Sequence, residues 1–188
     1  VFANTSFAAD SHKFRMLSFT NKGLKYFWDQ QNRLIDSIEM MSNKKLSVAL
    51  YAEGELASVK EIFELVSSGT MEMGSDWPGY WSGKNTAFDL LAAQVMGLSP
   101  EDYIMWIYNG GGFELYQEIY GKFNLVYLPF DVTHMESGIR SNKPIRTLDD
   151  MKGMKIRLGG LVAGKVIQKF GAVPTMISGS ELYEAARR

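Results

Sequence analysis

Arg157 is the residue whose type and setting most directly suggest chemistry. It lies in an otherwise apolar strand pattern, Met154–Leu158, which runs into Gly159 and Gly160. A guanidinium matches a carboxylate with two parallel hydrogen bonds, so an arginine facing a cleft at this point would anchor an organic acid. Taken alone, the pattern favours a solvated position on the wet face of the strand over a place in a cleft.

A turn rich in aromatic residues is the second feature. Trp77, Tyr80 and Trp81 follow a short predicted strand that begins at Met71. Ligands of open α/β sheets bind beyond the carboxyl ends of the strands, and aromatic rings with a polar edge suit an organic ligand. Side-chain packing explains the turn equally well on spacing alone.

The segment Gly159–Val166 (GGLVAGKV) is close to a phosphate-binding P-loop, in a strand-to-helix setting. Its last position is Val166, where the loop needs a Ser or Thr hydroxyl for magnesium. A glycine-rich turn that lets a helix approach a strand is the favoured interpretation. The alternative is an α/β enzyme that acts on an organic acid or a nucleotide, with Arg157 and the Gly159–Lys165 loop as its anion site.

Composition removes several other classes of protein. The 188 residues include no cysteine, which excludes disulfides, thiolate catalysis and Cys-ligated zinc. The two histidines, His12 and His134, are too far apart in sequence for an HExxH pair. A net charge of -1 argues against a dedicated nucleic-acid-binding protein, and no apolar run approaches the length of a membrane span.

Hydrophobic periodicity predicts an α/β fold in which these residues are positioned. Strands and helices alternate through the first 76 residues, which indicates a sheet with parallel crossovers. Two helices separated by Gly110–Gly112 follow, with these glycines as a helix break rather than a phosphate cradle. A second α/β unit begins near Pro129. The predicted strands are 13–20, 46–51, 71–73, 154–158 and 172–177, and the predicted helices are 22–42, 59–66, 99–109, 113–120 and 161–170. Ser178 and Glu181 form a capping box that predicts one more short helix at the end of the chain.

Several segments together resemble the solute-binding proteins of TRAP (tripartite ATP-independent periplasmic) transporters. The most specific is Asp149–Arg157 (DDMKGMKIR). Tyr80–Lys84 (YWSGK) and Tyr108–Gly112 (YNGGG) look most like the branch that binds 2-oxo acids and related monocarboxylates. The remaining segments are Leu46–Leu56, Val66–Gly74, Lys143–Thr147, Phe170–Pro174 and Glu181–Ala185.

The resemblance implies a two-lobed, periplasmic-binding-protein-like architecture and a function without catalysis. A small organic acid would be captured between the lobes in the periplasm and delivered to the membrane permease subunits. Arg157 matches the family's carboxylate anchor, while Trp77, Tyr80 and Trp81 with Thr133 of the crossover strand would line the site. Glu136 stands where the branch tends to have an amide that helps to hold sodium beside the ligand. A carboxylate there would either bind a sodium or other cation, with Glu136 as a ligand, or repel an anionic ligand unless it is paired.

Length is the main departure from the family pattern, because the family continues well beyond the Glu181–Ala185 segment. Small residues at Ser6 and Ala8 indicate a leader remnant or a disordered terminus at 1–10. The rest of the chain divides into a first α/β lobe at 11–128 and a crossover strand with an incomplete second lobe at 129–188. Incomplete lobes leave strand edges and apolar faces uncovered. We therefore expect exposed apolar side chains on the 161–170 helix or the 172–177 strand, an open Arg157, and self-association through this lobe.

Overall fold

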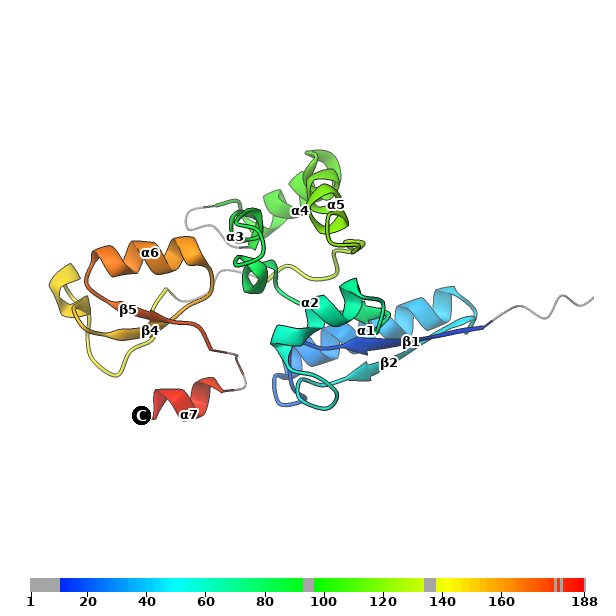
Figure 1. Ribbon diagram of the computed structural model, residues 1–188, viewed down its shortest axis with the longest axis horizontal. Coiled ribbons are helices and arrows are strands. Elements are labelled where there is room, and N and C mark those ends of the chain that lie inside the picture. Colours follow the sequence, from blue (N-terminus) through cyan, green and yellow to red (C-terminus); the bar gives the residue numbers. More distant parts are fainter. Residues whose placement is uncertain (1–10, 93–96, 134–137, 178, 180, 188) are drawn as a thin grey trace, which may run out of the picture. The chain divides into compact units, whose positions relative to one another are not determined.

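Figure 1 shows the computed structural model of the chain, which describes residues 11–92, 97–133, 138–177, 179 and 181–187. The chain divides into two compact units, Val1–Ser75 and Asp76–Arg188. Each unit holds its own parallel sheet, and each is described by itself below.

The first unit is built on a three-stranded parallel sheet with the order β2-β1-β3. The strands are β1 (His12–Leu17), β2 (Leu46–Tyr51) and β3 (Met73–Gly74). β1 pairs with β2 along its whole length, from His12 opposite Leu46 to Leu17 opposite Tyr51. The predicted alternation of strands and helices with parallel crossovers is therefore confirmed in this unit.

Helix α1 (Lys25–Met41) covers one face of this sheet. Its Ile35 packs against Met16 and Val48, and these three side chains are at most 8% exposed. The buried amide of Gln31 accepts a hydrogen bond of 2.6 Å from the Ser75 hydroxyl, which ties the helix to the end of the unit. Burial of this apolar face accounts for the helical spacing seen in the sequence.

Helix α2 (Val59–Ser67) is capped entirely from within its own first turn. Glu61 accepts hydrogen bonds from both the backbone amide and the hydroxyl of Ser58, at 2.8 and 2.7 Å. This capping box satisfies amide groups that an isolated helix end would leave open. These bonds lower the pKa of the Glu61 carboxyl.

The second unit opens with helices. The short 3-10 helix η1 (Pro78–Trp81) and α3 (Ala87–Ala92) precede a hairpin of α4 (Pro100–Asn109) and α5 (Gly112–Gly121). Gly111 lies between the two long helices with a φ of 85°, a left-handed conformation that favours glycine. The three glycines at 110–112 therefore form the predicted helix break.

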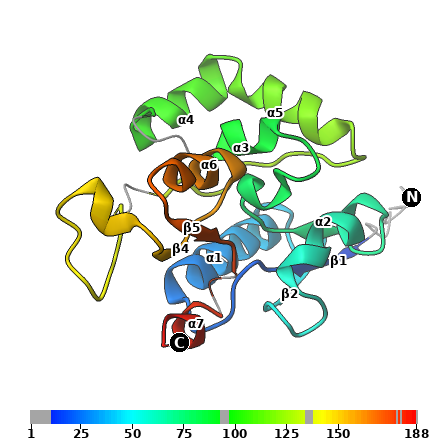
Figure 2. The same cartoon turned by 60° about the vertical axis from the view of Figure 1, so that its left-hand side comes forward.

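A two-stranded parallel sheet of β4 (Lys155–Arg157) and β5 (Val173–Thr175) completes the second unit, with α6 (Leu161–Lys169) as its crossover. Figure 2 shows α6 beside this small sheet. The 3-10 helix η2 (Leu148–Met151) precedes β4, and α7 (Leu182–Ala186) follows β5.

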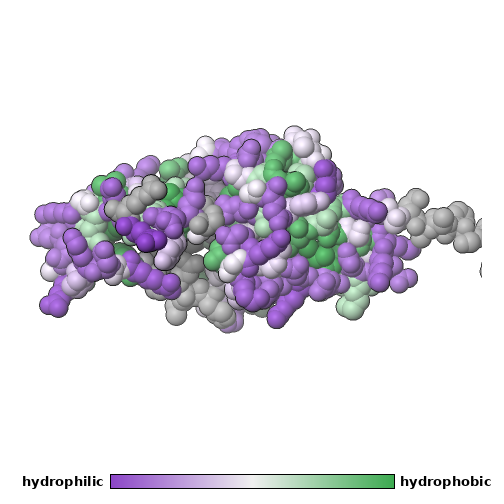
Figure 3. Space-filling view, turned by 90° about the horizontal axis from the view of Figure 1, so that it is seen from below, coloured by the Kyte–Doolittle hydropathy of each residue, from purple (hydrophilic) through white to green (hydrophobic). Residues whose placement is uncertain are grey.

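The expected exposure of apolar side chains on α6 and around β5 is confirmed. Five of them are between 47% and 53% exposed: Leu161, Val162, Val166, Val173 and Met176. The face of the molecule in Figure 3 is largely hydrophilic, with hydrophobic residues in separate patches. None of the helices in the described ranges has the length and apolar character that a membrane span requires.

The predicted elements agree with the structure except at some ends and at one helix. β1 ends at Leu17 where the prediction extended to Thr20, and β4 and β5 are each three residues long. Helix α3 was not predicted, because its six residues are too few to show a helical period. The lobe boundary at 128/129 stays a prediction, since the division at Ser75 concerns compactness and not ligand-binding lobes.

Candidate ligand site

Arg157 is the last residue of β4 and is exposed to solvent, as the sequence analysis expected. Its Nε donates a hydrogen bond of 3.1 Å to the carbonyl oxygen of Ile177, which follows β5. Within the described residues the guanidinium forms no ion pair and no other hydrogen bond. The bond to Ile177 holds one edge of the guanidinium, so the Nη1 and Nη2 edge remains available to a carboxylate.

The aromatic turn is a connected stack. The Tyr80 ring meets Trp77 edge to face at 5.4 Å between centroids and meets Trp81 at 6.2 Å. Trp81 is 4% exposed, whereas Trp77 and Tyr80 are half-buried. The structure therefore assigns Trp81 to packing and leaves Trp77 and Tyr80 as the rings that a ligand can reach.

Asp76 holds Trp81 in place. The Trp81 indole Nε1 donates a hydrogen bond to the Asp76 carboxyl. Desolvation raises the pKa of Asp76 to about 6, although the indole hydrogen bond acts in the opposite direction. A carboxyl is thus kept in a poorly solvated place at the start of the aromatic turn, where it accepts from one ring of the stack.

The Trp77 ring joins this turn to the segment that follows Arg157. A side-chain carbon placed on Gly159 would lie 2.4 Å from the ring, so only glycine allows this approach. The indole Nε1 also donates a 3.3 Å hydrogen bond to the carbonyl oxygen of Ala92, at the end of α3. The structure therefore brings Trp77 next to the glycines that follow Arg157, two features that the sequence presented separately.

The backbone amides at the N-terminus of α6 are hydrogen-bonded by a side chain of the same unit. Asp89 on α3 is 7% exposed, and its carboxylate oxygens accept hydrogen bonds from the backbone amides of Leu161 and Val162 at 2.9 and 2.7 Å. These are the amides that a P-loop would offer to a phosphate. The alternative of a nucleotide site in the Gly159–Lys165 loop is therefore wrong in this structure, because an internal carboxylate already occupies the helix N-terminus.

A cluster of tyrosines fixes the start of the segment that leads to Thr133. Tyr127 stacks on Tyr116 with 4.1 Å between ring centroids, and Gln117 exchanges hydrogen bonds with the Tyr127 backbone at 2.5 and 3.3 Å. Burial raises the pKa of both tyrosines, so they stay neutral. The hydroxyls of Tyr103 and Tyr116 both donate to the Leu91 carbonyl oxygen, at 3.0 and 2.6 Å.

The sequence analysis did not identify this cluster, because its members look like ordinary helix positions until the extended segment folds back onto them. Thr133 itself is exposed. Glu136 lies outside the described residues, so its place in the site is a prediction that the structure does not test. Within the described ranges, no group of three or more acidic or histidine side chains comes together to hold a metal ion.

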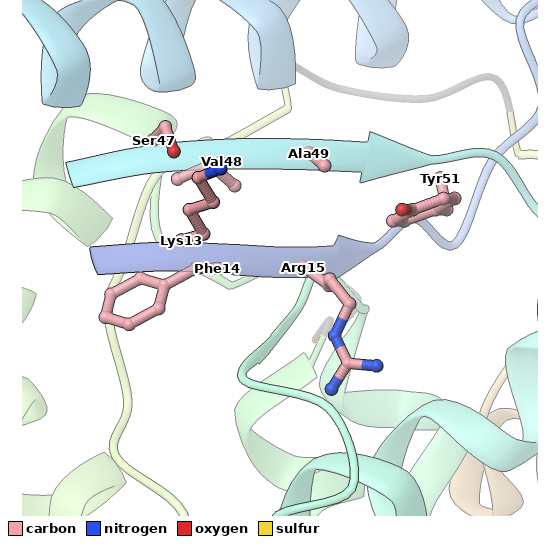
Figure 4. Close-up of a pocket in the computed structure, with 7 residues that line it drawn as sticks. All are labelled: Lys13, Phe14, Arg15, Ser47, Val48, Ala49 and Tyr51. Atoms are coloured by element: carbon pink, nitrogen blue, oxygen red, sulfur yellow. The ribbon is translucent and has the colours of Figure 1, made fainter. Parts of the chain in front are cut away.

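A separate hollow of about 530 Å³ lies on the sheet of the first unit. Figure 4 shows Arg15 and Lys13 on β1 and Tyr51 on β2 among the residues that line it. The Arg15 guanidinium is already paired with Glu72, at 2.9 Å from Nε and 2.6 Å from Nη2. This arginine therefore offers no unpaired fork to a carboxylate ligand.

A parallel α/β scaffold with an exposed arginine at a strand end is compatible with a binding protein for a small organic acid. Residues 22–188 match the family of bacterial extracellular solute-binding proteins, family 7, also called DctP. The chain belongs to this family. Its members are solute-binding proteins, and the comparisons give no support to the enzyme alternative.

The similar proteins agree with this assignment. A monocarboxylate 2-oxoacid-binding periplasmic protein from Nostoc is 32% identical over 148 residues, which cover 79% of this chain and 40% of the relative. A TRAP periplasmic solute-binding protein from Pseudoalteromonas atlantica, solved with sodium and pyruvate, is 30% identical with a TM-score of 0.90. One from Colwellia psychrerythraea, solved with calcium and pyruvate, has the same identity and TM-score.

Both structural matches cover 95% of this chain and 54% of the solved protein. The chain therefore spans about half the length of the proteins it resembles. The predicted fold class, an α/β periplasmic-binding-protein-like architecture of which part is present, is confirmed by these matches.

Proposed function

We propose that this protein captures a small monocarboxylate of the 2-oxo-acid class in the periplasm and delivers it to the membrane permease of a TRAP transporter. The observation that carries the proposal is the orientation of Arg157, whose Nε is held by the Ile177 carbonyl while no described acid occupies its outer edge. A planar fork held in this way is suited to two parallel hydrogen bonds with a carboxylate. Family membership and the pyruvate-bound relatives support the ligand class.

The proposed site joins Arg157 to the aromatic turn. Trp77 and Tyr80 would cover the apolar part of the ligand, because their rings are half-buried. Trp81 would pack behind them, because it is almost fully buried. Thr133 would contribute a hydroxyl from the crossover segment. A bound 2-oxo acid would thus meet one charged fork and aromatic walls, the combination expected of a small-molecule site.

We also propose a cation beside the ligand, with Glu136 among its ligands. The relatives from Pseudoalteromonas and Colwellia were solved with sodium and calcium respectively, each together with pyruvate. A carboxylate oxygen is a ligand that hard cations accept. Because the described residues form no acidic cluster of their own, the ion would depend on Glu136 and on the oxygens of the bound acid.

Calorimetry on protein expressed from the complete gene tests the proposal. Pyruvate is titrated with and without sodium or calcium, and acetate, lactate and inorganic phosphate serve as competing ligand classes. The proposal predicts saturable pyruvate binding that a cation strengthens, weaker binding of acetate, and none of phosphate. Phosphate binding without pyruvate binding would contradict it.

A further inference from the structure

Asp89 and the N-terminus of α6 form a long-range contact that the proposed function does not use. The two residues that donate to Asp89, Leu161 and Val162, are 72 and 73 positions away in sequence. Asp89 is buried, although it belongs to a helix of only six residues. A buried carboxylate that accepts two backbone amides is favoured by both hydrogen bonding and the helix dipole.

The same carboxylate also lies against the glycine turn. Gly160 has a φ of 89°, and a side-chain carbon built on it would lie 2.4 Å from Asp89 Oδ1. On the preceding residue, Gly159, such a carbon would meet the Trp77 ring at the same 2.4 Å. The turn between β4 and α6 is thus held between a carboxylate and an indole. A larger residue at Gly159 would push the Trp77 ring away from the backbone. A larger residue at Gly160 would push the Asp89 carboxylate away.

The carboxylate and the indole that hold this turn are both tied to helix α3. Asp89 is on α3, and the Trp77 indole donates to the carbonyl of Ala92 at the end of α3. Arg157 is the last residue of β4 and is two positions before Gly159. Movement of the glycine turn would therefore displace the backbone that carries the proposed carboxylate anchor.

We propose that Asp89 is a positioning residue for ligand binding, which fixes the Gly159–Gly160 turn and so the place of Arg157. The inference rests on the proposed function of Arg157. The carboxylate also has a second effect, because it occupies amides that would otherwise attract an anion. The ligand carboxylate is thereby directed to the Arg157 fork and not to the helix N-terminus.

The test is Asp89→Ala in protein from the complete gene, with pyruvate as the probe and Asp102→Ala as the matched control. Asp102 also lies in the first turn of a helix of this unit, but among the described residues its carboxylate accepts only from the nearby Ser99 hydroxyl, at 2.9 Å. We expect Asp89→Ala to weaken pyruvate binding by at least about tenfold, since two hydrogen bonds to a charged group are lost. Asp102→Ala should leave the affinity unchanged.

Formate supplies a readout that loss of packing alone would not produce. In Asp89→Ala, added formate should occupy the vacated helix N-terminus and restore part of the pyruvate affinity, whereas in the wild type it can only compete. Hydrogen exchange at the amides of Leu161 and Val162 should be faster in the variant and should slow again with formate. Wild-type affinity in Asp89→Ala, or unchanged exchange at both amides, would overturn the inference.

Asp89→Asn covers the case in which the alanine variant does not fold. The amide keeps the shape and one acceptor oxygen, so we expect an intermediate affinity and faster exchange at one or both amides. Wild-type values for both quantities would overturn the inference. If the wild-type protein itself fails to bind pyruvate, the proposed function is wrong. Hydrogen exchange at Leu161 and Val162 would then still show whether Asp89 fixes the turn before α6.

Discussion

Two strand arginines show how the two units differ. Arg15 on β1 forms an ion pair with Glu72, and its backbone amide donates to the same carboxylate at 2.8 Å. Arg157 on β4 has a carbonyl oxygen on one edge and no described acid on the other. Both are exposed, so exposure alone does not separate a structural arginine from a binding one. The difference lies in whether the chain supplies the carboxylate.

The helix N-termini show the same difference. Glu61 caps α2 together with Ser58 inside one turn, whereas α6 receives its carboxylate from Asp89 on a distant helix. The cap of α2 is thus local, although the first unit also contains long-range pairs such as Arg15 with Glu72, 57 positions apart. The second unit uses long-range contacts around the proposed site, where the position of each group matters for a ligand.

The largest expected effect comes from Arg157→Lys, with Arg15→Lys as its matched control. Removal of one partner of an ion pair that is buried in the bound state costs about 2–5 kcal/mol, or roughly thirty- to several-thousand-fold in affinity. Arg157→Lys keeps the charge but loses the fork, so it should weaken pyruvate binding clearly, up to this range. Arg15→Lys should leave the affinity unchanged and lower stability slightly. Calorimetry of both variants measures this. Equal affinity losses in the two variants would remove the distinction between the arginines.

Gly159→Ala should have the next largest effect. The added methyl group would lie 2.4 Å from the Trp77 ring, and overpacking of this kind typically costs about 1–3 kcal/mol. Gly121→Ala, at the end of α5 with no atom within 4 Å of the new methyl group, is the control. Thermal unfolding and pyruvate titration should both show a loss for Gly159→Ala only. A stable Gly159→Ala protein with full affinity would show that Trp77 does not fix this turn.

Opposite pH dependences should distinguish the two units. Asp76 has a pKa raised to about 6, so its folded form holds a proton more strongly than the unfolded chain. Stability therefore falls as pH rises from about 4 to 6, by on the order of 2–3 kcal/mol. Asp76→Asn keeps an acceptor for Trp81 and should remove this fall, which makes the variant more stable at pH 7. Urea unfolding from pH 4 to 7 measures it.

In the first unit the sign is reversed. The hydrogen bond from the Arg15 side chain lowers the pKa of Glu72 to about 2, so this pair stabilises the fold above pH 4.5 and is lost as pH falls from there toward 2. Glu72→Gln should remove this acid sensitivity without changing the behaviour between pH 4 and 6. A single transition with the same pH dependence in wild type, Asp76→Asn and Glu72→Gln would contradict both assignments.

The smallest effect concerns fluorescence. Pyruvate binding should change the tryptophan emission, and Trp77→Phe should abolish most of the change because Trp77 is the reachable indole of the turn. Trp81→Phe should retain it, since Trp81 is 4% exposed. Tyr80→Phe should shift the emission of the bound form only slightly. Loss of the signal in Trp81→Phe alone would reverse these roles.

Much of the fold could be predicted from the sequence because its signals are local. The period of α1, the Ser58 and Glu61 pair, and the glycine break at 110–112 each act within a few residues. Arg157 could be noticed for a similar reason, since a charge inside the apolar strand pattern of β4 is a local anomaly. The resemblance to TRAP solute-binding proteins then supplied its proposed role as carboxylate anchor.

The contacts that were not predicted connect distant parts of the chain. Asp89 lies on an unpredicted helix and meets residues more than 70 positions away, so no sequence window contains both. The same contact agrees with the interpretation of the P-loop-like pattern as a glycine-rich turn, because Asp89 occupies the helix N-terminus that a phosphate would need. The tyrosine cluster depends on Tyr127 stacking on Tyr116, which only the fold brings about.

The most direct test of the central claim is a crystal structure of the protein from the complete gene with pyruvate bound. We predict that Nη1 and Nη2 of Arg157 both lie within hydrogen-bond distance of the pyruvate carboxylate, while Nε keeps its bond to the Ile177 carbonyl and Asp89 keeps the amides of α6. A pyruvate carboxylate bound away from Arg157, above all at the N-terminus of α6 with Asp89 displaced, would contradict this account.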